Sequence, residues 1–269
     1  MKKVILITGV STGFGKETAS LLAERGHAVY GTIRNPIDTD PKVNILKMDL
    51  TNEDSIKAAV ETVISKEGRI DVLINNAGMH IGGPAENSPM DQVELIMDTN
   101  FLGLVRVTRA VLPHMRKEQS GTIINFSSIG GLMGLPFQPY YSAAKFAIEG
   151  FSEALRIELL QFNIKIVVIN PGDFNTNNTN NRRKFLAPTN ENDPYYKNFQ
   201  SALASMEKDE TNGWKPVVLA RKLVKIAECK NPAGRYKIGS FIQRISVTVK
   251  GLVSAKAWSK ILAMFYNIK

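Results

Sequence analysis

Short apolar runs alternate along the first part of the chain with stretches whose apolar residues recur at helical spacing. An apolar run bounded by glycine, asparagine or aspartate is typical of a buried strand. Such runs predict strands at 4–8, 28–33, 44–48, 71–74, 121–126 and 164–169. The stretches between them predict helices at 16–25, 55–64, 93–115 and 141–161.

The regular alternation of strands and helices predicts the fold class. Strands joined through helices pair in parallel, and right-handed crossovers place helices on both faces of the sheet. We therefore expect residues 1–269 to form a single α/β domain with a doubly wound parallel sheet. In such sheets ligands bind at the carboxyl ends of the strands, so those ends are where functional residues are expected.

The pattern changes after Gly172. Residues 173–192 are polar and rich in asparagine, and a helix is expected only from 193 to 206. Long connections in a compact domain are often lids or binding loops. We interpret residues 173–215 as a substrate loop or lid region.

Residues 221–269 form a basic C-terminal extension. They hold eleven Lys and Arg and a single acid, whereas the net charge of the whole chain is +9. A helix is expected over 254–266. Its apolar face would carry Trp258, Ile261, Leu262 and Phe265, opposite Lys256 and Lys260.

This extension has two interpretations. The helix can pack on the protein's own core or on a second subunit, or it can lie on a membrane surface. Nucleic-acid binding is disfavoured because the chain carries no recognised nucleic-acid module. The single cysteine excludes an intramolecular disulfide, and the apolar run at 4–7 is too short for a signal peptide. The expected location is cytoplasmic, with the membrane surface as the alternative.

A glycine-rich turn joins the first strand to the first helix. Glycines let a backbone turn tightly and approach a phosphate, which the N-terminus of a helix then attracts. The spacing differs from the common Gly-x-Gly-x2-Gly dinucleotide pattern. The candidate cofactor-binding residues in this turn are Gly9, Ser11, Thr12, Gly13, Phe14 and Gly15.

The end of the second strand discriminates between cofactors. An acid at this position binds the ribose hydroxyls of NAD, whereas a basic residue pairs with the 2′-phosphate of NADP. Arg34 occupies this position, and Ser11 can add a hydroxyl donor. The sequence therefore predicts NADP(H) as the cofactor.

Tyr141 and Lys145 are four residues apart at the start of a predicted helix, so they share a face. An adjacent ammonium and a positively charged nicotinamide would lower the pKa of the phenol, which is ordinarily about 10. Tyr141 could then act as a general acid or base on a carbonyl or alcohol oxygen. Tyr140 is a rival, but the residue four positions after it is Ala144.

Two further residues join this candidate site. The strand at 121–126 delivers Ser127 and Ser128 to its carboxyl end, where a hydroxyl can hold a substrate oxygen beside the phenol. Asn100 lies inside a predicted long helix, where asparagine is a mediocre helix former. Asn100 has either an exposed or capping role, or it marks a kink or a water site behind Lys145.

Together these motifs resemble the short-chain dehydrogenase/reductase superfamily over residues 1 to 176. The resemblance includes the four-residue motif Asn75-Asn76-Ala77-Gly78 and the pair Pro171-Gly172. It implies a Rossmann-type sheet of about seven parallel strands and a catalytic tetrad of Asn100, Ser128, Tyr141 and Lys145. Family members usually place the serine thirteen residues before the tyrosine, which favours Ser128 over Ser127.

The resemblance also extends the set of cofactor residues, and it implies no metal. Asp49 resembles the residue beside the adenine ring, and Thr176 resembles the residue that contacts the carboxamide. The added candidates are Asp49, Leu50, Asn76, Ala77, Gly78, Tyr141, Lys145, Pro171, Gly172 and Thr176.

Within the superfamily, residues 128–137 and 145–150 look most like hydroxysteroid and retinol dehydrogenases. This likeness implies an apolar carbonyl or alcohol substrate that is steroid-, retinoid- or lipid-like, with a sphingoid ketone as one example. It also implies a homo-oligomer by analogy. Two other functions stay open: an NADP-sensing protein without turnover, and an epimerase or dehydratase of the extended branch.

Overall fold

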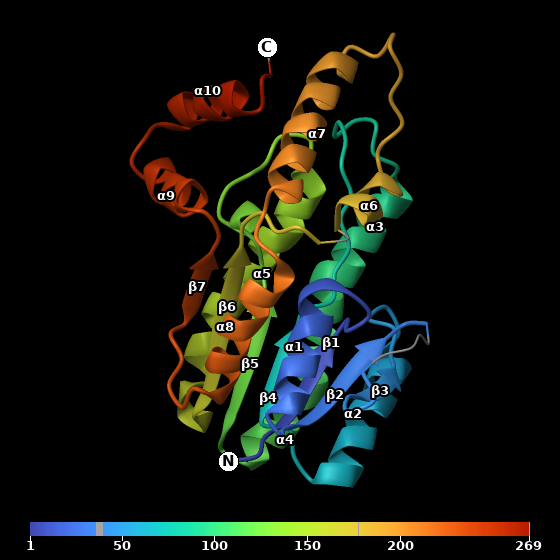
Figure 1. Ribbon diagram of the computed structural model, residues 1–269, viewed down its shortest axis with the longest axis vertical. Helices are drawn as coiled ribbons and strands as arrows, with labels where there is room; N and C mark the ends of the chain where they lie inside the picture. The colour runs from blue at the N-terminus through green and yellow to red at the C-terminus, as the bar shows by residue number, and fades with distance from the viewer. Residues whose placement is uncertain (36–39, 177, 269) are drawn as a thin grey trace.

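The computed structural model describes residues 1–35, 40–176 and 178–268. Seven parallel strands form one sheet in the order β3-β2-β1-β4-β5-β6-β7 (Figure 1). The predicted Rossmann-type sheet is thus confirmed. The strands are β1 (Val4–Thr8), β2 (Ala28–Ile33), β3 (Asn44–Lys47), β4 (Val72–Asn75), β5 (Gly121–Phe126), β6 (Ile164–Pro171) and β7 (Arg235–Ile238).

Helices cover both faces of this sheet. In Figure 1, α1 and α8 lie in front of it, whereas α2, α4 and α5 lie behind. The helices are α1 (Gly13–Glu24), α2 (Glu53–Glu67), α3 (Met90–Met97), α4 (Gly103–Lys117), α5 (Pro139–Glu158), α6 (Asn178–Arg183), α7 (Tyr196–Thr211), α8 (Pro216–Glu228), α9 (Phe241–Lys250) and α10 (Ala255–Phe265).

Two apolar cores follow from the alternation of side chains along the strands. Ile5 and Ile7 of β1 point to one face, where they join Leu22 of α1 and Leu219 of α8. Leu6 of the same strand points to the other face and packs with residues from α2, α4 and α5. The inner strands β1, β2, β4 and β5 are therefore buried on both sides, which explains why they appear as continuous apolar runs in the sequence.

The helix predicted at 93–115 is interrupted, and this prediction needs correction. A π-helical turn, η1 (Asp98–Leu102), separates α3 from α4. Such turns widen a helix locally and are frequent at functional sites. Asn100 lies in this turn and is buried, so its exposed alternative is wrong.

The later elements gather at the carboxyl ends of the strands. Figure 1 shows α6, α7, α9 and α10 at that end of the molecule. The region 173–215 contains α6 and α7, and the helix expected at 193–206 spans Tyr196–Thr211. The basic segment 221–269 begins inside α8 and supplies β7, so only α9 and α10 lie beyond the sheet.

The apolar face predicted for the last helix is divided in the structure. Trp258 is buried against Ile129 and Met133, with Leu262 packed beside them, so this part docks on the protein's own core. Ile261 and Phe265 are exposed instead. Among the described helices, none is long and apolar enough to cross a membrane.

Candidate active site

The glycine-rich turn leads from β1 into α1. Gly9 and Gly13 have φ angles of +73° and +60°, in the left-handed region that favours glycine. A Cβ on Gly9 would lie 2.8 Å from Cα of Ala77, and one on Gly15 would collide with the carbonyl oxygen of Gly9. Gly9 is therefore required by both its conformation and its close packing, Gly13 by its conformation and Gly15 by its packing.

The start of the loop after β4 holds this turn in place. The Thr8 hydroxyl accepts hydrogen bonds from the backbone N–H groups of Asn76 and Ala77, each at 3.0 Å. The Asn76 side chain donates to the carbonyl oxygens of Thr8 and Gly9. Asn76 thus shapes the predicted phosphate-binding turn through its hydrogen bonds to the backbone.

Phe14 follows the turn and packs inward. Its ring stacks on Phe126 at a centroid distance of 6.0 Å and meets Phe174 edge-on at 5.0 Å. These contacts join the start of α1 to the ends of β5 and β6. The Phe14 side chain therefore connects the glycine-rich turn with the segment that carries Pro171, Gly172 and Thr176.

Arg34 and Asp49 lie near each other at the carboxyl ends of β2 and β3. The Thr51 backbone N–H is the main cause that lowers the pKa of Asp49, and the Arg34 guanidinium adds to the effect. Arg34 is exposed and Leu50 half-buried. The glycine turn, the start of α1 and the Arg34 cation therefore fit the diphosphate and 2′-phosphate of a dinucleotide.

Three of the four predicted catalytic residues, Ser128, Tyr141 and Lys145, meet at the end of β5, whereas Asn100 contacts the loop after β4. Tyr141 is hydrogen bonded to Ser128. The Lys145 Nζ lies 5.7 Å from the centre of the Tyr141 ring and donates to the Phe126 carbonyl oxygen at 2.9 Å. Asn100 uses both ends of its amide on the backbone of Met79, at 2.7 and 2.8 Å.

The structure distinguishes the two serines. Ser127 is buried, and its hydroxyl donates to the carbonyl oxygen of Lys145 at 3.4 Å. Ser128 caps a short 3-10 turn by accepting from the Gly130 N–H at 3.0 Å, and it also meets the Tyr141 hydroxyl. The geometry therefore favours Ser128 over Ser127 as the hydroxyl beside the phenol.

The pKa of Tyr141 departs from the prediction. We expected Lys145 to lower it, but burial raises it to about 12, partly opposed by the hydrogen bond from Ser128. Burial also lowers the pKa of Lys145 to about 8, because removing an ammonium from water disfavours its charged form. The groups of the protein alone thus keep Tyr141 protonated at neutral pH.

His80 is a site residue that the sequence reasoning missed. Its ring stacks on Tyr141 at a centroid distance of 3.9 Å, and it is hydrogen bonded to Gln138. Gln138 in turn contacts Met206 of α7. Burial, aided by the Arg182 charge, lowers the pKa of His80 to about 3, so the imidazole that covers the phenol ring is neutral.

The low pKa of His80 predicts a pH-dependent stability. As the pH falls below about 6.5, the imidazole of His80 becomes protonated in the unfolded chain but stays neutral in the folded protein. The contribution of His80 to the free energy of unfolding is therefore fully present above that pH and is lost below it. Between pH 7.5 and 5 this should remove about 2 kcal/mol from the free energy of unfolding. Urea unfolding of the wild type and His80→Phe measures the difference, which should be constant from pH 7.5 to 8.5. An equal slope in both proteins below pH 6.5 would contradict the prediction.

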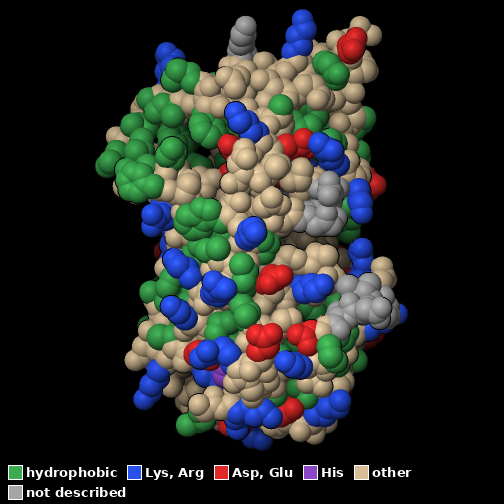
Figure 2. All heavy atoms as spheres, viewed as in Figure 1, with side chains coloured by type: hydrophobic (Ala, Val, Ile, Leu, Met, Phe, Trp, Pro, Cys, Tyr) green, Lys and Arg blue, Asp and Glu red, His purple; other side chains and the backbone are tan. Residues whose placement is uncertain are grey.

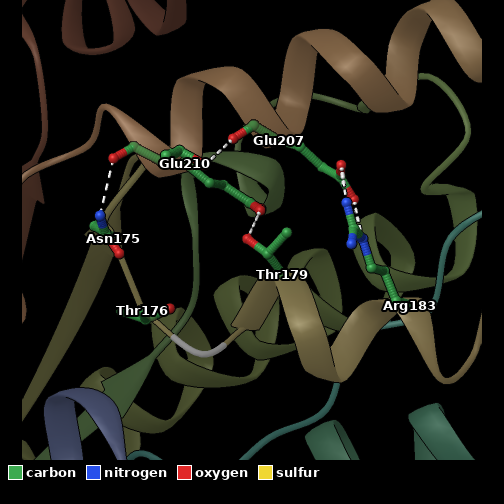
Figure 3. Close-up of a pocket in the computed structure, with 7 residues that line it drawn as sticks. Asn175, Thr176, Thr179, Arg183, Glu207 and Glu210 are labelled. Atoms are coloured by element: carbon green, nitrogen blue, oxygen red, sulfur yellow. Dashed lines mark hydrogen bonds and ion pairs between the residues drawn. The ribbon is translucent and has the colours of Figure 1, made fainter.

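A buried ion pair connects α6 and α7, the two helices of the region 173–215 that we interpret as a lid. Arg182 of α6 is 1% exposed and holds both carboxylate oxygens of Glu210 of α7, at 2.6 and 2.9 Å. Thr179 also donates to Glu210. Figure 3 shows the neighbouring pocket of about 230 Å³. It is lined by Asn175, Thr176, Thr179, Arg183, Glu207, Glu210 and Thr211.

Asp173 lies between this lid and α9. Its carboxylate accepts a hydrogen bond from the side chain of Gln243, whose other end accepts from the Asp173 backbone N–H. Burial and the charge of Glu210 raise the pKa of Asp173 to about 7. In the sequence, Asp173 is marked only as a polar residue after Pro171-Gly172. Its interactions cannot be recognised there because its partners come from distant parts of the chain.

Comparison with known proteins gives three findings. A family model described as short chain dehydrogenase matches residues 3–187. A 3-ketodihydrosphingosine reductase from Bacteroides thetaiotaomicron is 48% identical over 267 residues, which are 99% of each chain. Retinol dehydrogenase 8 from Homo sapiens is 36% identical over 184 residues, covering 63% of this chain and 58% of that protein.

One solved structure is also informative. The closed form of a serine dehydrogenase complexed with NADP+ matches with a TM-score of 0.76 at 26% identity. The match covers 88% of this chain and 94% of that chain. The likeness therefore extends over most of both chains.

Proposed function

Since this chain belongs to the short-chain dehydrogenase family, we propose that it reduces the ketone of a long-chain sphingoid substrate with NADPH as the hydride donor. It is an oxidoreductase acting on alcohol and carbonyl groups, and the resemblance to retinol-type members is confirmed. The main support for the proposed substrate is the 48% identity to a 3-ketodihydrosphingosine reductase over nearly the whole of both chains.

The whole-chain match also separates this function from its alternatives. The retinol dehydrogenase match covers only 63% of this chain, whereas the reductase match includes the lid and the C-terminal helices. An NADP-sensing protein or an epimerase is disfavoured because a relative that matches over 99% of both chains is named a reductase.

A reduced nicotinamide supplies the hydride when it is bound. The proposal for the protein's own groups is that Ser128 donates a hydrogen bond to the substrate oxygen while Tyr141 gives that oxygen a proton. A pKa of about 12 suits this direction, because the phenol is protonated at neutral pH and an alkoxide is the stronger base. For Lys145 and Asn100 we propose the roles that the family resemblance implies: Lys145 binds the nicotinamide ribose, and Asn100 holds a water in a proton relay.

An apolar cluster supports the long-chain substrate. Met206 and Tyr266 pack together with Phe137 beside them, and Phe137 meets Phe199 at a centroid distance of 5.4 Å. The cluster is connected to Tyr141 through Met206, Gln138 and His80, so an alkyl chain bound there would lie near the catalytic hydroxyl.

A substrate screen tests this function. NADPH oxidation is followed with 3-ketodihydrosphingosine, a steroid ketone, retinal and a small water-soluble ketone. We expect the sphingoid ketone to have the highest kcat/KM. A higher kcat/KM with the steroid or retinal would overturn the proposed substrate while leaving the oxidoreductase class intact.

NADPH preference is the second part of the proposal, and the NADP+-bound neighbour supports it. Arg34→Asp should lower the NADPH/NADH ratio of kcat/KM by about 100-fold, because a charge-assisted bond to the 2′-phosphate is replaced by repulsion. Arg116→Asp, an equal charge change on the exposed end of α4, should keep the wild-type ratio. An unchanged ratio in Arg34→Asp would make the assignment wrong.

The expectations about oligomeric state, cellular location and membrane contact remain part of the proposal. They are a homo-oligomer, a cytoplasmic location and contact between the basic C-terminal segment and a membrane surface.

A further inference from the structure

We propose that the outer face of α9 and α10 is a docking surface for an anionic lipid membrane, on two helices that contact the segments beside the candidate active site. The surface itself is independent of the substrate, whereas its use in delivering a sphingoid ketone rests on the proposed function. Its exposed apolar members, called the docking face below, are Phe241, Ile242, Ile245, Leu252, Ile261, Met264 and Phe265.

The docking face is large and contiguous along two helices. Phe241 and Ile245 are one turn apart on α9, and Ile261 and Phe265 are one turn apart on α10. Ile242 and Met264 are 66% and 69% exposed. Figure 2 shows hydrophobic side chains gathering over these helices. Contiguous apolar patches on a protein surface mark sites of protein or membrane contact.

The opposite faces of the same helices pack against the end of the molecule that holds the candidate active site. Gln243 of α9 binds Asp173, and a Cβ on Gly172 would run into the Gln243 side chain. Trp258 of α10 packs on Ile129, immediately after Ser128. A membrane that contacts the docking face would therefore lie one helix away from the catalytic residues.

The charge around the docking face favours anionic lipid. Residues 239–269 contain five Lys and Arg and no acid. Arg244, Lys256 and Lys260 are exposed, whereas Lys250 donates inward to the Leu132 carbonyl oxygen. Apolar helices flanked by cations are typical of interfacial membrane segments.

The same charges disfavour a second copy of the chain as the occupant. In a two-fold interface the same patch meets itself, so the cations of one protomer would face those of the other. Like charges brought together in an interface oppose association. An anionic surface has the complementary sign.

Vesicle sedimentation with the full chain tests the proposal. We expect binding to vesicles of phosphatidylcholine and phosphatidylglycerol in equal parts, and weaker binding to pure phosphatidylcholine. Ile242→Ser/Met264→Ser should lower the partition coefficient at least about tenfold, because two exposed apolar side chains no longer enter the lipid. Lys256→Gln/Lys260→Gln should lower it about tenfold on the mixed vesicles only.

The matched control is Ile157→Ser/Leu160→Ser, which removes two equally exposed apolar side chains near the end of α5 far from Tyr141. This variant should bind vesicles as the wild type does. Wild-type protein that does not sediment with the mixed vesicles would overturn the proposal, and so would full binding by Ile242→Ser/Met264→Ser. Conversion of a dimer to a monomer by that variant, without vesicle binding by the wild type, would assign the face to a second copy instead.

Activity separates this proposal from the proposed function. All docking-face variants should reduce a small water-soluble ketone at the wild-type rate, whereas reduction of a vesicle-embedded sphingoid ketone should fall in step with vesicle binding. Vesicle binding without sphingoid reduction would sustain the docking face and refute the substrate. Reduction of the detergent-dispersed sphingoid ketone without vesicle binding would refute the docking face and sustain the substrate.

Discussion

Tyr141→Phe is expected to lower kcat for ketone reduction by about a thousandfold, because the phenol that donates the proton is removed. The ring remains, so its stacking on His80 at 3.9 Å and the local packing should persist. NADPH affinity, measured by the fluorescence of the bound nicotinamide, should change little. Stopped-flow measurement of NADPH oxidation at saturating substrate gives the rate.

Tyr140→Phe is the matched control for this experiment. The Tyr140 hydroxyl donates to the Ala85 carbonyl oxygen at 3.0 Å, away from the predicted tetrad. Its removal should keep kcat within about twofold, because one exposed hydrogen bond contributes little to the reaction. A Tyr141→Phe enzyme that stays within tenfold of the wild-type rate would show that another group supplies the proton.

The sheet was largely predictable because its strands are buried on both faces. β1, β2 and β5 begin and end where the sequence predicts, since a continuous apolar run bounded by polar or glycine residues has few alternatives. β7 was not predicted. Ile238 is buried, but the other three residues are half-buried and two of them are charged, so only pairing with β6 makes this segment a strand.

Local motifs identified the catalytic group but not the residues that surround it. Tyr141 and Lys145 share a helix, and Ser128 ends a strand, so short-range spacing is sufficient to find them. His80 and Gln138 meet across 58 positions of the chain, and only the fold brings them together. A lone histidine after a strand carries no signal for stacking on a particular tyrosine.

The direction of the Tyr141 pKa shift shows the same limit. Sequence spacing places Lys145 nearby, but it does not give the degree to which both groups are removed from water. Burial raises the pKa of the Tyr141 phenol and lowers that of the Lys145 ammonium. Both shifts disfavour the charged forms, so the expected attraction between a phenolate and an ammonium is weakened. The protein thus provides a protonated acid, and a bound oxidised nicotinamide would provide the positive charge that favours the reverse reaction.

The lid pair is expected to produce the second large effect. Arg182→Met leaves the carboxylate of Glu210 buried without its cation, which should cost about 3–5 kcal/mol. α6 has only six residues, so this cost should appear as local opening of the lid rather than as global unfolding. Cleavage of the lid by a protease should therefore accelerate by about 100-fold or more, with a similar loss of kcat/KM.

Two variants separate the pair itself from a general disturbance of the lid. Arg182→Met/Glu210→Met removes both charges and should recover most of the protease resistance, because no unpaired ion remains buried. Arg183→Met breaks the adjacent ion pair between Arg183, which is 60% exposed, and Glu207. Because an exposed pair contributes little, this variant should leave the protease cleavage rate and the activity nearly unchanged. If Arg182→Met resists the protease as well as Arg183→Met does, the buried pair does not hold the lid. If the double variant is as sensitive as Arg182→Met, the loss comes from Arg182 packing rather than from the uncompensated charge of Glu210.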